Sequence, residues 1–221
     1  MTSTMSTQVP RGSSILSAEQ YFGQLVTAVR HLPFNVIEQV CDVLMAAYER
    51  ESTVFLFGNG GSAALASHFA CDLGKGTAGC DGGKRFRAMA LTDNLAVITA
   101  WANDADYSSI FAEQLAHFVK PQDVVIAISG SGASRNVLEA VSLARDAGAI
   151  TIGITGFGGG KLAPMCDVAI IVPSDNMQII EDLHLSAAHA IFTLLRHRIV
   201  HKTHTVVVVA DKTMAAREGR S

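Results

Sequence analysis

Apolar residues recur every three or four positions between about Ser17 and Arg50. This spacing places them on one face of a helix. The tripeptide His31-Leu32-Pro33 interrupts the pattern, because proline disfavours helical backbone in the residue before it. The segment therefore predicts two consecutive helices.

Short runs of β-branched and aromatic residues follow, and helical patterns separate them. The predicted strands are Thr53–Phe57, Arg87–Leu91, Val124–Ser129, Ile150–Thr155 and Val168–Val172. Helical patterns begin near Ser62, Leu95, Tyr107 and Ser134, and a last long helix is expected over Met177–Arg198. Strands that are apolar on both faces and alternate with helices are typical of a parallel sheet covered on both sides. The pattern thus predicts an α/β fold around a central parallel five-stranded sheet.

Neither a linker nor an internal repeat divides this pattern, so we expect one domain over residues 17–198. Residues 1–16 are rich in Ser and Thr, and we expect them to form a disordered tail. Residues 199–221 are expected to form a C-terminal tail, which contains a strand-like apolar run, Thr205–Ala210.

The composition excludes several classes of protein. Hydrophobic residues make up 49%, charged residues 17%, and mean hydropathy is +0.30, which excludes a disordered or highly charged chain. A net charge of −3 does not suggest nucleic-acid binding. Apolar runs fall short of the roughly 20 residues of a membrane helix, and the N-terminus lacks a signal-peptide core, so we expect a cytoplasmic location. Low charge with high apolarity predicts oligomerisation.

Two loops that follow predicted strands carry candidate chemistry, because ligands of open parallel sheets bind beyond the carboxyl ends of the strands. The first loop is Gly58–Ala63, where glycines allow close approach of the backbone to a ligand. We expect Ser62 to cap the next helix, whose free N–H groups favour an anion. The run also fits the dinucleotide fingerprint G-x-G-x-x-A, but the acidic residue expected about 20 positions later is missing.

The second loop is Ser129–Ser134, with three hydroxyls at a strand-to-helix turn. Such a turn suits a phosphate, which accepts several hydrogen bonds at once. Ordinary helix capping by Ser131 or Ser134 is the alternative. A P-loop is excluded because no Gly-Lys-Ser/Thr follows, and the loop lacks the G-x-S-x-G pattern of a nucleophilic serine.

Between about Thr53 and Arg196 the chain contains a set of motifs: FGNGGSA at 57–63, His68-Phe69-Ala70, Trp101-Ala102-Asn103-Asp104, ISGSGAS with Asn136-Val137, Thr155-Gly156 with Gly159-Gly160-Lys161, and Glu181-x-x-His184-x-x-x-x-His189. In these motifs the chain resembles the sugar isomerase (SIS) domain family, and within it the phosphoheptose isomerase branch. The resemblance implies a single SIS domain, a flavodoxin-like three-layer sandwich with an N-terminal helical pair.

The resemblance also implies conversion of sedoheptulose 7-phosphate to D-glycero-D-manno-heptose 7-phosphate, one Zn²⁺ per active site, and a homotetramer with active sites at subunit interfaces. Carried over by position, the phosphate would be held by Ser129, Gly130, Ser131 and Ser134. The sugar would be lined by Asn59, Gly60, Gly61, Ser62, Asn103 and Asp104. The metal ligands would be His68, Asp72, Glu181 and His189, of which Asp72, Glu181 and His189 would also be catalytic.

Two positions depart from the family pattern. Asp72 replaces the usual catalytic glutamate, and Glu181 replaces the usual glutamine. The shorter side chain withdraws a carboxylate by roughly 1.5 Å, a shift to which catalytic geometry is sensitive. Isomerisation through an enediol needs a base that takes and returns a proton. Our hypothesis is that Asp72 stays a metal ligand while Glu181 takes or shares proton abstraction.

Spacing alone leaves the metal site open. His68 and Asp72 are four residues apart and share a helix face, although both also fit a merely structural role. Glu181 and His189 would lie about 12 Å apart along one straight helix, so a shared ion requires a late helix start or different subunits. His184, three residues after Glu181, could pair with it locally; we expect it instead to pack between helices with one hydrogen bond.

Two other functions remain open at this stage. One is a non-catalytic SIS protein that binds a bacterial replication initiator. The other is an isomerase of a different sugar phosphate, because pocket shape rather than sequence decides the sugar.

Overall fold

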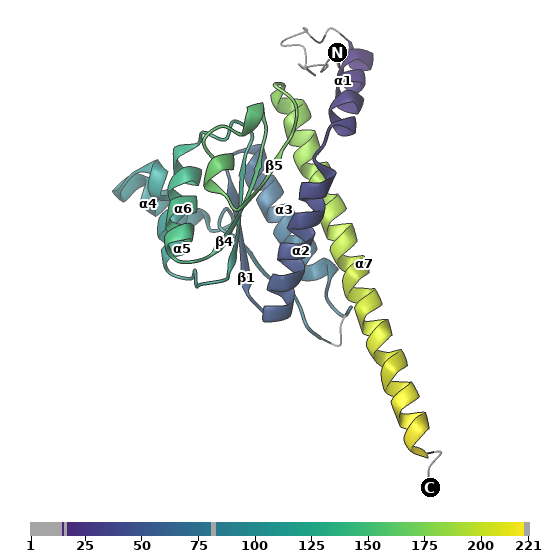
Figure 1. The fold of residues 1–221 in the computed structure, drawn as a ribbon. Coiled ribbons are helices and arrows are strands. Elements are labelled where there is room, and N and C mark those ends of the chain that lie inside the picture. The colour runs from purple at the N-terminus through teal and green to yellow at the C-terminus, as the bar shows by residue number, and fades with distance from the viewer. Residues whose placement is uncertain (1–14, 16, 81–82, 219–221) are drawn as a thin grey trace, which may run out of the picture.

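The computed structural model describes residues 15, 17–80 and 83–218. Of the tail predicted to be disordered, residues 1–16, only Ile15 is among the described residues, so that prediction lies outside them. Ser17 is the N-cap of the first helix. Figure 1 shows a sheet with helices on both of its faces and a long C-terminal helix that extends past the rest of the fold.

All five strands pair in parallel, in the order β2-β1-β3-β4-β5. The strands are β1 Thr53–Gly58, β2 Arg87–Ala90, β3 Val124–Ser129, β4 Ile150–Thr155 and β5 Val168–Ile171. The predicted parallel sheet is confirmed, and this order is the flavodoxin-like one. Because the strand order reverses between β1 and β3, the loops that follow these two strands open at the switch point, where ligands bind in such sheets.

Helices cover both faces of the sheet, as predicted. They are α1 Ala18–Arg30, α2 Phe34–Arg50, α3 Gly61–Gly76, α4 Leu95–Asp104, α5 Ala112–Ala116, α6 Arg135–Asp146 and α7 Met177–Glu218, with short 3₁₀ turns η1 Tyr107–Ser109, η2 Phe157–Gly159 and η3 Ala163–Met165. In Figure 1, α2, α3 and α7 lie on one face and α5 and α6 on the other. Each face has its own apolar core, with Phe69 and Ile191 in one and Phe111 and Val141 in the other.

The last helix departs from the prediction. It begins at Met177 as expected but continues past Arg198 to Glu218, so the strand-like run Thr205–Ala210 is helical. The physical reason is that no Pro or Gly occurs from Met177 to Glu218, so nothing in the backbone stops a helix that is already formed. None of the helices in the described part of the chain is long and apolar enough to cross a membrane.

Candidate functional site

The loop after β1 leads directly into α3. A Cβ on Gly58 would lie 2.6 Å from the Ile128 carbonyl oxygen, so only glycine fits where β1 and β3 approach each other. Gly60, at φ +56°, is the residue that caps α3, and it has no side chain to offer. The expectation that Ser62 caps this helix is therefore wrong: the cap position lies two residues earlier, and Ser62 is buried in the first helical turn. The first N–H groups of α3 carry no side-chain cap.

The loop after β3 gathers its hydroxyls at the start of α6. Ser134 occupies the N-cap position, but its side chain makes no capping bond. Its Oγ lies 3.3 Å from the Oγ of Ser129, and the Ser131 Oγ accepts a hydrogen bond from the Ala133 N–H at 3.3 Å. Ordinary capping by Ser134 is thus not what the structure shows. An uncapped helix N-terminus beside hydroxyls is a suitable site for an anion.

The glycine-rich segment after β4 holds this second loop in place. The Gly132 carbonyl oxygen accepts hydrogen bonds from the Lys161 N–H at 2.8 Å and from the Leu162 N–H at 2.9 Å. Gly132 itself has φ +60°, and a Cβ there would lie 2.3 Å from the Gly159 carbonyl oxygen. The serine loop is therefore fixed by backbone contacts and needs no ligand to take its shape.

The first turns of α7 contact both loops. A Cβ on Gly130 would lie 2.6 Å from the Met177 Sδ, and a Cβ on Gly61 would lie 3.0 Å from the Glu181 Oε1. Glu181 thus places its carboxylate against the N-terminus of α3, where the helix dipole favours negative charge.

Farther along the same helices, two imidazoles and a carboxylate meet. The Nε2 atoms of His68 and His189 are 2.9 Å apart. The Asp72 Oδ2 lies 3.4 Å from the His68 Nε2 and 3.9 Å from the His189 Nε2. The three ligand atoms lie within 4.8 Å of one another, and all come from one chain. Imidazole nitrogens and a carboxylate oxygen are ligands that Zn²⁺ accepts.

Glu181 lies apart from this cluster but in the same cavity. The cavity has a volume of about 450 Å³, and its lining includes Gly61, His68, Glu181 and His189. The helix starts at Met177, four residues before Glu181. Glu181 and His189 therefore both lie within α7, and their separation along its axis is about 12 Å. The structure therefore brings together three of the four predicted ligands.

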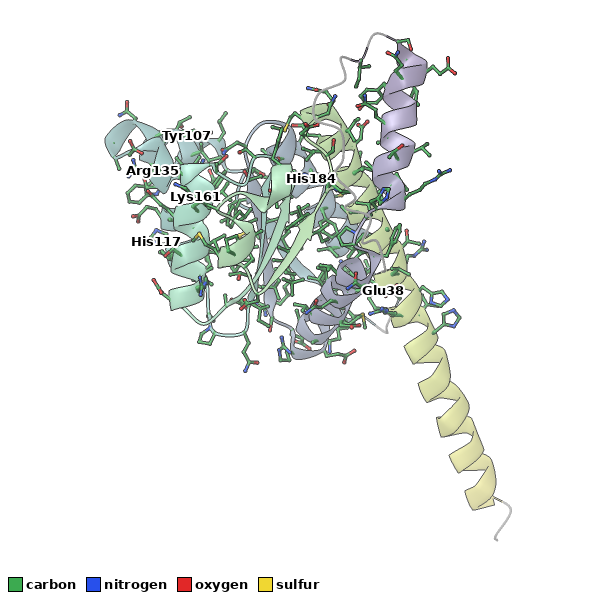
Figure 2. The ribbon with its side chains drawn as sticks, turned by 45° about the horizontal axis from the view of Figure 1, so that its top comes forward. Glu38, Tyr107, His117, Arg135, Lys161 and His184 are labelled. Carbon is green, nitrogen blue, oxygen red and sulfur yellow. The ribbon has the colours of Figure 1, made fainter. Side chains whose placement is uncertain are left out.

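His184 is buried, with 1% of its surface exposed, and Figure 2 shows it on the sheet side of α7. Neither of its ring nitrogens makes a hydrogen bond of ordinary geometry, although the backbone of Thr155 interacts with the ring. The expected burial of His184 is confirmed, and its packing between helices stays a prediction. Burial lowers the pKa of His184, because the charged imidazolium loses its hydration.

Asn103 and Asp104 lie at the end of α4, exposed, with the Asn103 amide donating to the Asp104 carboxylate at 2.7 Å. Figure 1 shows α4 on the opposite side of the sheet from α7. No residue of α4 is buried. Within this chain the structure does not bring these two side chains to the His68 cluster, and their sugar-binding role stays a prediction.

The structure adds Asn136 and Tyr107, two residues that the sequence did not single out for a role. The side-chain amides of Asn59 and Asn136 exchange two hydrogen bonds of 2.9 Å, and the Tyr107 hydroxyl donates to the Asn59 Oδ1 at 3.1 Å. A sequence signal existed for Asn136, since a polar residue stands in the first turn of α6 on its otherwise apolar buried face.

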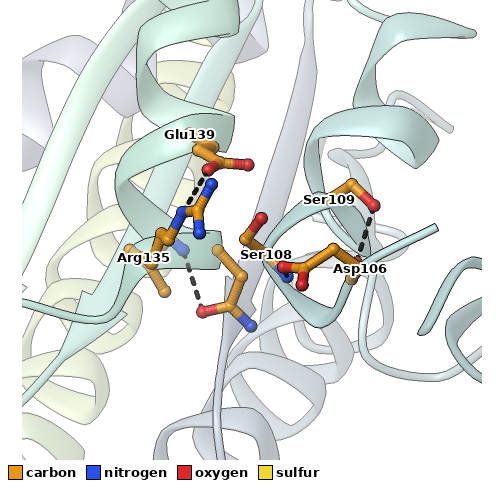
Figure 3. A network of polar contacts seen from close by, with 7 residues as sticks. Asp106, Ser108, Ser109, Arg135 and Glu139 are labelled. Carbon is orange, nitrogen blue, oxygen red and sulfur yellow. Dashed lines mark hydrogen bonds and ion pairs between the residues drawn. The ribbon is translucent and has the colours of Figure 1, made fainter.

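Figure 3 shows the surroundings of this first turn, where Arg135 pairs with Glu139 at 2.8 Å. Across from it, Asp106 caps the η1 turn and accepts a hydrogen bond from the Ser108 N–H at 2.8 Å. Hydrogen bonding from Ser108 lowers the pKa of Asp106. The capped turn presents Tyr107 to the loop that follows β1.

Comparison with known proteins agrees with this geometry. Residues 19–156 match the SIS domain family. The phosphoheptose isomerase of Helicobacter pylori strain P12 is 36% identical over 168 residues, which are 76% of this chain and 86% of that protein. Two solved phosphoheptose isomerases superpose with a TM-score of 0.74: that of Francisella tularensis at 32% identity, covering 81% of this chain and 96% of that one, and that of Neisseria gonorrhoeae at 29%, covering 80% and 95%. The chain therefore belongs to the SIS domain family and, within it, to the phosphoheptose isomerases.

Proposed function

We propose that this protein interconverts sedoheptulose 7-phosphate and D-glycero-D-manno-heptose 7-phosphate by proton transfer through an enediol. The observation that carries the proposal is that α7 contacts a serine-lined loop at its start and supplies His189 to an imidazole–carboxylate cluster farther along. Names of the relatives supply the substrate class.

The serine loop is the phosphate site in this proposal. Ser129, Ser131 and Ser134 offer hydroxyls, and the first turn of α6 offers backbone N–H groups without a side-chain cap. A phosphate held there contributes binding energy that does not change during the reaction and fixes the reacting carbons in place.

The donor set of the cluster fits zinc, because two imidazole nitrogens and one carboxylate oxygen already lie within 4.8 Å of one another. His68, Asp72 and His189 would hold the ion. When bound, it would stabilise the negative charge that develops on the substrate oxygen.

Proton transfer falls to a carboxylate in the same cavity. Glu181 lines the cavity with His68 and His189 but lies outside the three-residue cluster. A carboxylate that is not tied up as a ligand can take the proton from one carbon and return it to its neighbour. Asp72, shortened by one methylene and 3.4 Å from the His68 Nε2, would serve as a metal ligand.

We further propose that the active unit is a homotetramer with sites at subunit interfaces. Met177 and His189 are 12 residues apart on one helix, which is about 18 Å along the axis. An extended seven-carbon sugar phosphate spans roughly 10 Å. The substrate is thus shorter than the distance between the two ends of the site in one chain, and side chains from a neighbouring copy would supply the missing contacts. Large apolar side chains exposed on α1 and at the start of α2, namely Phe22, Val26 and Phe34, supply a surface for association.

The test is direct. Purified protein is mixed with sedoheptulose 7-phosphate, with and without added Zn²⁺, and the sugar anomeric signals are followed by NMR. Conversion supports the proposal, and its absence under both conditions rejects it. Parallel reactions with a pentose phosphate and a hexose phosphate decide whether the enzyme prefers a different sugar.

A further inference from the structure

An amide pair ties the two ligand loops together. Asn59 follows β1, and Asn136 lies in the first turn of α6, directly after the serine loop. Each side-chain amide donates one N–H to the oxygen of the other at 2.9 Å. Asn136 is 3% exposed, so this pair is shielded from competing water.

The backbone of α6 fixes which way both amides point. The Val137 N–H lies 3.0 Å from the Asn136 Oδ1, and a backbone N–H can only donate. This contact therefore defines the oxygen side of the Asn136 amide. Its NH₂ group must then face Asn59, which in turn must present its own oxygen.

Tyr107 completes the arrangement from the other side. Its hydroxyl donates to the Asn59 Oδ1 at 3.1 Å, so that oxygen accepts two hydrogen bonds. The Asn59 NH₂ group donates one hydrogen to Asn136, and its other hydrogen has no partner among the described residues. Figure 2 shows Tyr107 near Arg135 at the start of α6.

We propose that Asn136 and Tyr107 are positioning residues that lock the Asn59 amide with one N–H directed to a substrate oxygen. The inference rests on the proposed function together with the sugar contact that the family resemblance implies for Asn59. A flipped Asn59 would present its oxygen, which can only accept, so the lock favours a substrate whose oxygen accepts a hydrogen bond at that point. Because the pair joins the β1 loop to the α6 turn, it also sets the spacing between the sugar and phosphate contacts.

The kinetic test compares Tyr107→Phe and Asn136→Leu in the wild-type and Asn59→Ala backgrounds. Tyr107 is 55% exposed, so its loss of a hydroxyl leaves folding intact. We expect kcat/KM to fall about three- to tenfold in Tyr107→Phe and about ten- to hundredfold in Asn136→Leu, mainly through kcat. In the Asn59→Ala background both changes have no further effect, because their target is gone. Ser109→Ala, in the same turn, is the control with unchanged activity.

A second measurement does not need turnover. The two side-chain amide protons of Asn59 are followed by NMR, and one of them is expected to exchange slowly with water in the wild type and rapidly in Asn136→Leu. Equal exchange in both proteins overturns the inference, as does an undiminished effect of Tyr107→Phe in the Asn59→Ala background. A wild type that converts no sugar phosphate overturns the proposed function alone, and the exchange measurement still decides whether the amide is locked.

Discussion

The Nε2 atoms of His68 and His189 lie 2.9 Å apart although 121 residues separate them in the chain. At this distance one ring carries the hydrogen and the other accepts it. A metal ion held by this pair would take the place of that hydrogen, since both nitrogens must offer lone pairs to a shared ion.

The first prediction concerns metal content. His189→Ala removes one of three ligand side chains, so we expect the variant to retain less than about a tenth of the wild-type zinc after dialysis. Elemental analysis of the dialysed protein measures this. His197→Ala, an exposed histidine two turns farther along α7, serves as the control. Equal zinc in His189→Ala and wild type would contradict the metal assignment.

The second prediction separates the two carboxylates. Glu181→Gln should lower kcat by about 100-fold or more while zinc content is kept, because it removes the proposed base and leaves the cluster intact. Asp72→Asn should lower zinc content together with activity. Full turnover of Glu181→Gln combined with an inactive, zinc-loaded Asp72→Asn would assign the base to Asp72 instead.

The third prediction uses the contact between Gly61 and Glu181. A Cβ on residue 61 would lie 3.0 Å from the Glu181 Oε1, so Gly61→Ala displaces the carboxylate while the flexible side chain absorbs the strain. We expect kcat to fall about tenfold with little change in Tm. Gly74→Ala on the same helix meets nothing within 4 Å and should leave kcat unchanged. An unaltered kcat in Gly61→Ala would show that the position of Glu181 is not critical.

The fourth prediction concerns the fixed serine loop. Gly132→Ala combines a positive φ with a Cβ 2.3 Å from a backbone oxygen, and we expect it to reduce the free energy of unfolding by about 3 kcal/mol. Gly158 also has positive φ, but nothing lies within 4 Å of its Cβ position, so Gly158→Ala should cost only about 1 kcal/mol. Denaturant unfolding measures both. Equal losses would mean that the loop yields readily.

The fifth prediction is a pH dependence. Burial lowers the pKa of His184 in the folded protein, whereas the unfolded chain has the ordinary value of about 6.5. Protonation therefore favours the unfolded state, so this stability is complete above pH 6.5 and is lost as pH falls below it. His184→Leu should flatten the decline of Tm between pH 7 and pH 5. A slope equal to that of the wild type would show that His184 does not cause it.

Much of the fold follows from local pattern. The five strands and the break at Pro33 could be predicted because alternation of apolar runs and the backbone limits of proline act over a few residues. The length of α7 could not, since the valine run after Thr205 has strand propensity that an uninterrupted helix overrides. Ser62 failed as a cap because Gly60 made the turn instead.

The site divides in the same way. That His68 and Asp72 share a face follows from a spacing of four, and the serine loop follows from its hydroxyls at a strand end. The roles of Tyr107 and Asn136 depend on tertiary contacts to Asn59 across 48 and 77 residues. No local pattern contains such contacts. The positions of Asn103 and Asp104 relative to a substrate depend on neighbouring subunits in our proposal.

The single helix α7 reaches Gly130 with Met177, Gly61 with Glu181 and His68 with His189. The spacing of these three contacts is therefore set by the rise of one helix, about 1.5 Å per residue. Inserting one residue between Glu181 and His189 would rotate His189 by about 100° relative to Glu181. His189 would then lose its contact with His68, while Met177 and Glu181 would keep theirs.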